Sequence, residues 1–266
     1  MGDSRAIGIF DSGVGGLTVV RAVMERLPWE SIIYFGDTAR VPYGIKSRET
    51  ITEYALQITD FLLQKNVKLL IIACNTMAAV AYPAIKLRSP TPVLDVIDAG
   101  ARLAVAKTVS GRIGVIGTPA TINSNAYARS IHRYRTESFV FSQSCPLFVP
   151  LVEEGWFNHP ITRAVAQEYL QPLLTESIDS LVLGCTHYPL LKPLLREVIG
   201  GSIHLIDSAE AMAEIAANIL RLENLAVTES SSPDYEFFVT DIPHRFQTIG
   251  EYALGRSMTN VKMAKI

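Results

Sequence analysis

The sequence predicts an α/β protein, because short β-branched segments alternate with longer amphipathic segments along its 266 residues. Buried strands are expected at 6–10, 31–35, 67–73, 91–97, 111–117, 138–142, 179–184 and 202–206, with one more candidate within 223–240. Helical patterns separate them, most clearly at 48–65 and 208–224. Continuous apolar strands separated by helices are typical of mainly parallel sheets that helices cover on both faces.

A repeat in the order of the elements predicts two similar domains. AIGIFDSG opens the chain, and RIGVIGTPAT opens a second series at 112–121. LLIIACNT (69–76) and LVLGCTH (181–187) both end an apolar run at a cysteine. The interval between the two openings is close to the interval between these cysteines. We expect one domain from residues 1–98 and 207–266, and a second from residues 99–206.

Composition and charge exclude several classes of function. The chain is 48% hydrophobic and 19% charged, which is typical of a globular protein. Its net charge of −2, with scattered basic residues, argues against a nucleic-acid partner. The sequence contains no apolar run long enough to span a membrane, and its start, MGDSRAIGIF, is no signal peptide. Three cysteines fit reduced thiols, so we expect a cytoplasmic protein.

Polar or glycine-rich loops follow five of the expected strands. In open α/β sheets, ligands bind beyond the carboxyl ends of the strands. If the two domains face each other, these loops line one cleft, which is the expected active site. The loops are DSGVGG (11–16), GDTARVPYG (36–44), CNT (74–76), GTPAT (117–121) and CTH (185–187).

The thiols of Cys74 and Cys185 are the main candidates for chemistry. A single cysteine at the end of an apolar strand is commonly a small packed side chain. Two cysteines at equivalent positions, each expected to open a helix, indicate a chemical role, since a helix N-terminus stabilises a thiolate. Cys145 lacks this context, and we expect it to be packing only.

Other loop residues could assist these thiols. Asp11 is either a helix cap or a carboxylate near Cys74, and Ser12 offers a hydroxyl to a substrate. His187 could orient or exchange a proton with the thiol two residues before it. Glu153, from its position alone, reads as surface charge. Hydroxyl, amide and backbone donors for carboxylate and ammonium groups are expected from Tyr43, Gly44, Asn75, Thr76, Thr118, Thr121 and Thr186.

Two thiols across a cleft suit inversion of a stereocentre. One thiolate removes a proton from a carbon, and the opposite thiol delivers another to the far face. Mirror-image substrates need mirror-placed catalysts, which explains the duplication. The DSGVGG loop matches neither a dinucleotide fingerprint nor a P-loop, so no cofactor is expected.

These motifs also carry a resemblance to the glutamate racemases of the cofactor-independent aspartate/glutamate racemase family. It rests on IGIFDSGVGGLTV, GDTARVPYG, ACNT, CPLFVPLVEEG, LGCTHYPLL and the tail pattern FFVTDIPHRF, in that order over nearly the whole chain. The resemblance implies two facing domains, no metal, and Cys74 and Cys185 as the acid/base pair. It also implies that Asp11, Glu153 and His187 support proton transfer. Its substrate contacts are Asp11–Ser12, Tyr43–Gly44, Asn75–Thr76 and Thr186–His187.

The resemblance further implies a cytoplasmic homodimer that supplies D-glutamate for peptidoglycan. Three alternatives stay open. A related racemase could act on aspartate or a hydantoin, since the length of the substrate cannot be inferred from spacing. A zinc enzyme could use Cys74, Cys185, His187 and Asp11. A binding protein could capture an amino acid between the domains without chemistry.

Overall fold

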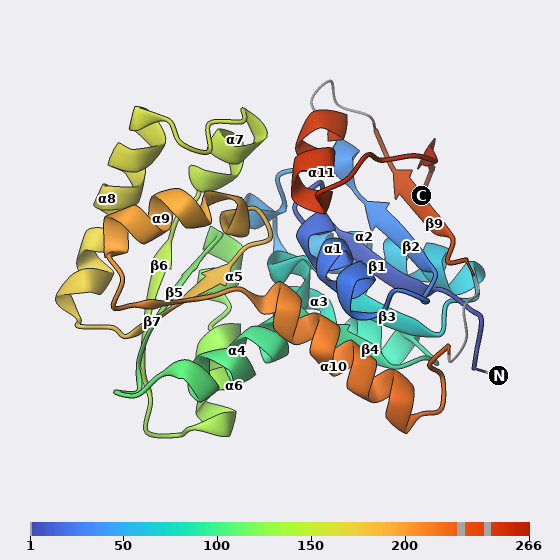
Figure 1. Cartoon of the computed structure of the whole chain (residues 1–266), viewed down its shortest axis with the longest axis horizontal. Coiled ribbons are helices and arrows are strands. Elements are labelled where there is room, and N and C mark those ends of the chain that lie inside the picture. The colour runs from blue at the N-terminus through green and yellow to red at the C-terminus, as the bar shows by residue number, and fades with distance from the viewer. Residues whose placement is uncertain (1, 228–231, 242–245) are drawn as a thin grey trace.

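The computed structural model describes residues 2–227, 232–241 and 246–266, and it contains two parallel sheets (Figure 1). Residues 242–245 of the tail pattern FFVTDIPHRF therefore lie outside the described part of the chain. The first sheet has six strands in the order β10-β9-β2-β1-β3-β4. These strands are β1 (Ile7–Asp11), β2 (Ile32–Gly36), β3 (Leu69–Ile72), β4 (Val93–Asp95), β9 (Tyr235–Val239) and β10 (Val261–Met263).

The second sheet has four strands in the order β6-β5-β7-β8, also all parallel. They are β5 (Arg112–Gly117), β6 (Phe139–Ser144), β7 (Ser180–Gly184) and β8 (His204–Ile206). Every expected strand forms, so the α/β prediction is confirmed; β10 was not expected. The first sheet thus holds β1 to β4, β9 and β10, and the second holds β5 to β8. The division into two domains with bounds at 98 and 207 stays a prediction.

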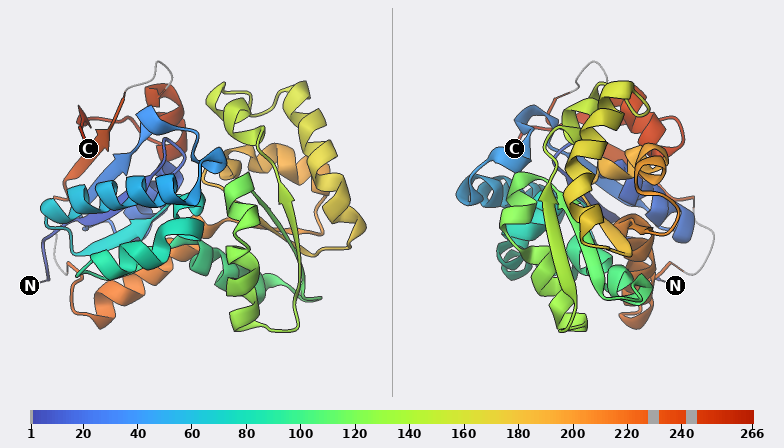
Figure 2. Two further views of the ribbon diagram at one scale, coloured as in Figure 1. Left: turned by 180° about the vertical axis from the view of Figure 1, so that it is seen from behind. Right: turned by 90° about the vertical axis from the view of Figure 1, so that its left-hand side faces the viewer.

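Helices cover both faces of each sheet (Figures 1 and 2). Around the first sheet lie α1 (Leu17–Arg26), α2 (Arg48–Gln64), α3 (Asn75–Arg88) and α11 (Phe246–Leu254). Around the second lie α5 (Pro119–Asn123), α6 (Ala126–Tyr134), α7 (Phe148–Glu153), α8 (Pro160–Thr175) and α9 (Lys192–Ile199). Because both faces are covered, β1, β2, β3 and β7 are buried along their whole length. We call each sheet with its helices a lobe.

The chain passes between the lobes twice, on the same side of the molecule. The first passage enters α4 (Val96–Lys107) after β4, and the second enters α10 (Ser208–Leu222) after β8. These two helices lie at the bottom of Figure 1, whereas α7 and α11 approach each other at the top. There the ring of Phe157, just after α7, stacks on Tyr252 of α11, with centroids 4.6 Å apart and planes 9° from parallel.

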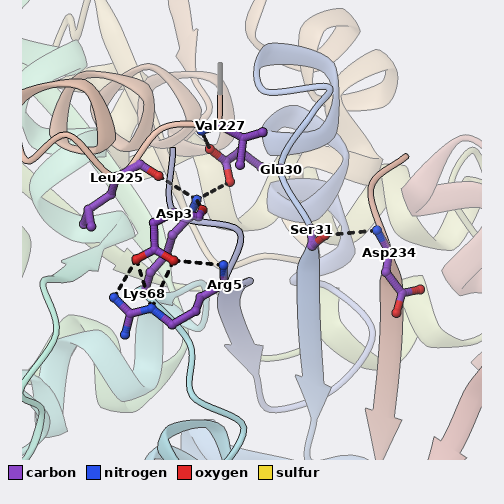
Figure 3. A network of polar contacts seen from close by, with 8 residues as sticks. All are labelled: Asp3, Arg5, Glu30, Ser31, Lys68, Leu225, Val227 and Asp234. Atoms are coloured by element: carbon purple, nitrogen blue, oxygen red, sulfur yellow. Dashed lines mark hydrogen bonds and ion pairs between the residues drawn. The ribbon is translucent and has the colours of Figure 1, made fainter. Parts of the chain in front are cut away.

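A buried ion pair ties four segments together at the end of the first sheet opposite the strands' carboxyl ends (Figure 3). Lys68 is fully buried, and its Nζ lies 2.6 Å from Glu30 Oε2. The same Nζ donates to the carbonyls of Asp3 (2.5 Å) and Leu225 (2.7 Å). Glu30 Oε1 in turn accepts from the backbone N–H of Val227 at 2.9 Å. The network joins the N-terminal segment, the starts of β2 and β3, and the segment after α10.

No helix in the described ranges is long and apolar enough to cross a membrane.

Candidate active site

A cavity of about 340 Å³ opens between the two lobes, and both predicted thiols line it. The lobe of β1 contributes Ser12, Val41, Pro42, Tyr43, Gly44, Ile45, Cys74, Asn75 and Thr76. The other lobe contributes Thr118, Pro119, Pro146, Val149, Pro150, Glu153, Cys185, Thr186 and His187. Of the residues expected from the sequence, Asp11 and Thr121 do not line the cavity. Both are buried and lie in contact with residues that do.

Cys74 ends the loop after β3 and caps α3. Its Sγ accepts from the backbone N–H of Met77 at 3.5 Å and lies 3.6 Å from Ser12 Oγ. Burial raises the pKa of the Cys74 thiol to about 12, and the negative charge of Asp11 adds to this. The helix N–H lowers it by less, so the expected lowering by the helix N-terminus is outweighed. The resting form of Cys74 is therefore the thiol.

Cys185 follows β7 but, contrary to expectation, does not open an α-helix. A turn and a 3₁₀ segment, η3 (Tyr188–Leu191), come first, and α9 begins only at Lys192. The sequence CTHYPLLKP places prolines at 189 and 193, and a proline beyond the first turn of a helix disfavours it, because proline lacks the backbone N–H and its ring clashes with the preceding turn. The two thiol loops are thus similar in position but different in backbone.

His187 links Cys185 to Glu153 across the cavity wall. Its Nδ1 lies 3.9 Å from Cys185 Sγ, and its Nε2 lies 3.2 Å from Glu153 Oε1. Burial alone would lower the pKa of His187, but hydrogen bonds and negative charge from Cys185 and Glu153 raise it to about 10. Glu153 ends α7 and is half-buried, with 39% of its side chain exposed. It is therefore more than the surface charge its sequence position indicates.

Asp11, at the end of β1, is both a cap and a link between the lobes. Its Oδ2 accepts from the backbone N–H groups of Gly13 (3.2 Å) and Gly16 (2.9 Å) at the start of α1. Thr186 of the other lobe donates its hydroxyl to Oδ1 at 3.3 Å. A Cβ at Gly15 would clash with the Thr186 hydroxyl, so this approach of the lobes requires glycine there.

Hydroxyl and amide groups make up most of the polar lining. Thr118 Oγ1 lies 2.9 Å from Thr76 Oγ1 and 3.0 Å from Thr121 Oγ1, which joins the lobes through hydroxyls. The Tyr43 hydroxyl donates to the buried carboxylate of Asp37, a residue that does not line the cavity. A Cβ at Gly44 would lie 2.6 Å from Thr118 Cβ, so the backbone of this loop approaches Thr118 of the other lobe closely.

The lining has few charged side chains, as the expected hydroxyl, amide and backbone donors imply, and an apolar wall that was not expected from the sequence. Its charged side chains, within the described ranges, are Glu153 and His187, and no lysine or arginine is among the lining residues. The remaining wall is apolar and rich in proline: Val41, Pro42, Ile45, Pro119, Pro146, Val149 and Pro150. The signal was present in the motifs VPYG, GTPAT and CPLFVP, whose prolines flank the polar residues.

The four residues of the zinc alternative do not form a metal site. Among the residues that the structure describes, no group of three or more His, Cys, Asp and Glu side chains could hold a metal ion.

Comparison with known proteins identifies the family. The sequence model of the Asp/Glu/Hydantoin racemases matches residues 17–216. The chain belongs to this family. This racemase is 66% identical to a glutamate racemase of Syntrophus aciditrophicus, over 98% of this chain and 96% of that one. It is 56% identical to a glutamate racemase of Neisseria meningitidis, over 100% of this chain and 98% of that one.

The fold of this racemase matches that of solved relatives. A crystal structure of glutamate racemase from Francisella tularensis in complex with D-glutamate is 44% identical, with a TM-score of 0.93, covering 99% of this chain and 98% of that one. The resemblance inferred from the motifs is confirmed, and so is the reaction class, because racemases are isomerases.

Proposed function

We propose that this racemase interconverts L- and D-glutamate by a two-base reaction that uses Cys74 and Cys185 and no cofactor. The observation that carries the proposal is a single cavity lined by two thiols, one from each lobe. The substrate comes from the relatives, since the Syntrophus aciditrophicus and Neisseria meningitidis proteins are named glutamate racemases.

In this reaction one cysteine, as thiolate, removes the proton on Cα and becomes a thiol. The carbanion that forms is planar, and the opposite thiol donates its proton to the other face and becomes a thiolate. Atoms and charge balance, and the enzyme ends with its protons exchanged between the two sulfurs. The family resemblance assigns Cys74 to D-glutamate and Cys185 to L-glutamate.

The surroundings of each sulfur support this exchange. When Cys185 is a thiolate, the protonated His187 beside it stabilises the charge, and Glu153 keeps the imidazole protonated. When Cys74 is a thiolate, the Ser12 hydroxyl and the Met77 N–H donate to it. Burial makes that thiolate unstable and hence strongly basic, as abstraction of a weakly acidic Cα proton requires.

The substrate's carboxylates and ammonium group would be held by neutral groups. We propose contacts from Ser12, Tyr43–Gly44, Asn75–Thr76, Thr118 and Thr186–His187, with Asp11 and Thr121 supporting them from behind the lining. Hydroxyl, amide and backbone N–H donors satisfy carboxylate oxygens without a cation.

Single cysteine variants test the two-base assignment. Cys74→Ala and Cys185→Ala should each fail to racemise glutamate. Each should still eliminate a leaving group from the β-carbon of one Cα configuration of a β-substituted glutamate, because elimination needs only the first proton abstraction. The retained configurations should be opposite. Cys145→Ala is the matched control, since Cys145 is buried but does not line the cavity, and it should racemise normally.

Equal enantiomer preference in the two variants would contradict the mechanism. Incubating the wild type with both enantiomers of glutamate and of aspartate tests the substrate, and turnover of aspartate alone would favour the related racemases. Activity should survive dialysis against a chelator and carbonyl reagents. A bound zinc ion whose removal abolishes activity would replace the proposal with a metal mechanism.

The family resemblance also carries the cellular role. We propose that the protein works in the cytoplasm as a homodimer and supplies D-glutamate for peptidoglycan. Sedimentation at micromolar concentration, with and without glutamate, tests the assembly, and a monomer under both conditions would exclude it. Growth of a bacterium that requires added D-glutamate should be restored by this gene.

A further inference from the structure

Tyr127 is a buried side chain that contacts both thiol loops without lining the cavity. It is the second residue of α6 and is 3% exposed. Asn125, just before the helix, has a left-handed backbone with φ of 54°, which asparagine tolerates, and this turn leads directly into α6. The Tyr127 hydroxyl crosses to the other lobe and donates to Asn75 Oδ1 at 2.6 Å.

The ring of Tyr127 fills the space beside two glycines. A Cβ at Gly184, the residue before Cys185, would lie 3.0 Å from its Cε2. A Cβ at Gly100, in the connecting helix α4, would lie 3.2 Å from its Cε1. One side chain therefore spans Asn75 beside Cys74, Gly184 beside Cys185, and a helix through which the chain passes between the lobes.

The hydrogen bond determines which end of the Asn75 amide is available. A side-chain amide has one acceptor oxygen and one NH2 donor group. Burial raises the pKa of Tyr127 well above its usual value, so the hydroxyl stays protonated and can donate. With Oδ1 engaged by Tyr127, the NH2 group is the part of Asn75 left to face the cavity that this residue lines.

We propose that Tyr127 is a positioning residue of this racemase: its hydroxyl orients the Asn75 amide so that the NH2 group binds a substrate carboxylate. Its ring holds the Cys185 loop at a fixed distance from that amide. This inference rests on the proposed glutamate reaction, and it goes beyond it by adding a residue that touches no substrate.

Tyr127→Phe removes the hydroxyl and keeps the ring. We expect the KM for both enantiomers to rise about tenfold, the effect of losing one hydrogen bond to a charged group, with a smaller change in kcat. The melting temperature should stay close to that of the wild type. Tyr134→Phe is the matched control, because Tyr134 lies on the same helix and its hydroxyl donates to Asp98, outside the cavity. Its KM should not change.

A double-mutant cycle separates positioning from general packing. If Tyr127 acts through Asn75, Tyr127→Phe should add almost nothing to the loss caused by Asn75→Ala. Losses that multiply, or a Tyr127→Phe variant that matches Tyr134→Phe in KM, would overturn the proposal. If Tyr127→Phe does not fold, Asn75→Asp decides instead. It keeps the acceptor for Tyr127 and lacks the NH2 group, so an unchanged KM would refute the inference.

Failure of the proposed glutamate reaction can be distinguished from failure of the role proposed for Tyr127. Binding of glutamate measured by titration calorimetry reports on the carboxylate contact without turnover. A wild type that binds glutamate but does not racemise it would contradict the proposed reaction, while the Kd values of the variants would still decide the role of Tyr127.

Discussion

The positive charge of His187 depends on two neighbours, Cys185 and the half-buried Glu153. Its folded pKa, raised to about 10 by Cys185 and Glu153 against the effect of burial, exceeds the unfolded value of 6.5. The folded protein therefore holds this proton more tightly than the unfolded chain does. Its contribution to stability is complete below about pH 6.5 and is lost as the pH rises through about 10.

Glu153→Gln should lower the pH at which the stabilising contribution of the His187 proton is lost. Without the carboxylate, one cause of the raised pKa disappears, so the His187 imidazole should deprotonate earlier in a titration followed by NMR. The alkaline limb of the activity profile should move in the same direction. Glu154→Gln, the exposed neighbour that does not line the cavity, serves as the control and should titrate like the wild type. The same His187 titration in both variants would show that Glu153 has no such role.

Serine in place of Cys74 tests the acidity that the reaction needs. A hydroxyl is far less acidic than a thiol, so Cys74→Ser should lose most racemisation although its size is nearly unchanged. Turnover should be followed with each enantiomer by circular dichroism. A variant within a few-fold of the wild-type rate would exclude thiolate chemistry at this position.

Among the secondary-structure elements, β3 is held at its start by the buried Lys68–Glu30 pair. Lys68→Ala would leave the Glu30 carboxylate buried without its partner, which costs about 3–5 kcal/mol of unfolding free energy. Because the network lies at the opposite end of the sheet from the cavity, the KM for glutamate should not change. Urea unfolding and steady-state kinetics on the same samples measure both.

Lys262→Ala is the control for this prediction. The Lys262–Glu236 pair is partly exposed, and removing an exposed ion pair costs about 1 kcal/mol or less. Equal destabilisation by the two substitutions would mean that burial of Lys68 does not matter.

The elements differ in how well the sequence predicts them. The expected strands are recognisable because strands covered on both faces are continuously apolar. The edge strand β10 was missed because it has three residues, two of them exposed, and its sequence VKM has no such pattern. The prediction that Cys185 opens a helix was wrong. Pro189 disfavours an α-helix at this point, and a turn and a 3₁₀ segment form instead. Tyr127 was missed because AYARSIHRY reads as a surface helix, and only the fold brings this residue to Asn75.

At the level of the whole molecule, most of the candidate lining could be predicted. Loops at the carboxyl ends of parallel strands gather at one edge of a sheet, so Ser12, Cys74 and Cys185 were identifiable from position. The apolar part of the wall and the link from His187 to Glu153 were not identifiable from position alone. They depend on how α7 lies over the cavity, which is a long-range property of the packing.

The Phe157–Tyr252 stack joins the two lobes on the side opposite the two chain connections. Both connections between the lobes run along one side, through α4 and α10, whereas the stacked rings join the segment after α7 to α11 on the other. A rotation of one lobe about these two connections would separate the stacked rings and would move α7, which ends at Glu153. An aromatic pair contributes about 0.5–1.5 kcal/mol, so Tyr252→Ala should weaken glutamate binding about twofold to tenfold.

Hydrogen exchange should be faster in α7 of Tyr252→Ala than in the wild type. Trp29→Ala, at an exposed side chain, is the control and should change neither the affinity for glutamate nor the hydrogen exchange of α7. Unchanged hydrogen exchange in α7 would show that the stacked rings do not hold the two lobes together. If the rings hold the lobes together, the time a glutamate molecule spends in the cavity is set by a contact that touches neither substrate nor sulfur. Its two residues, Phe157 and Tyr252, lie 28 residues before and 67 residues after Cys185.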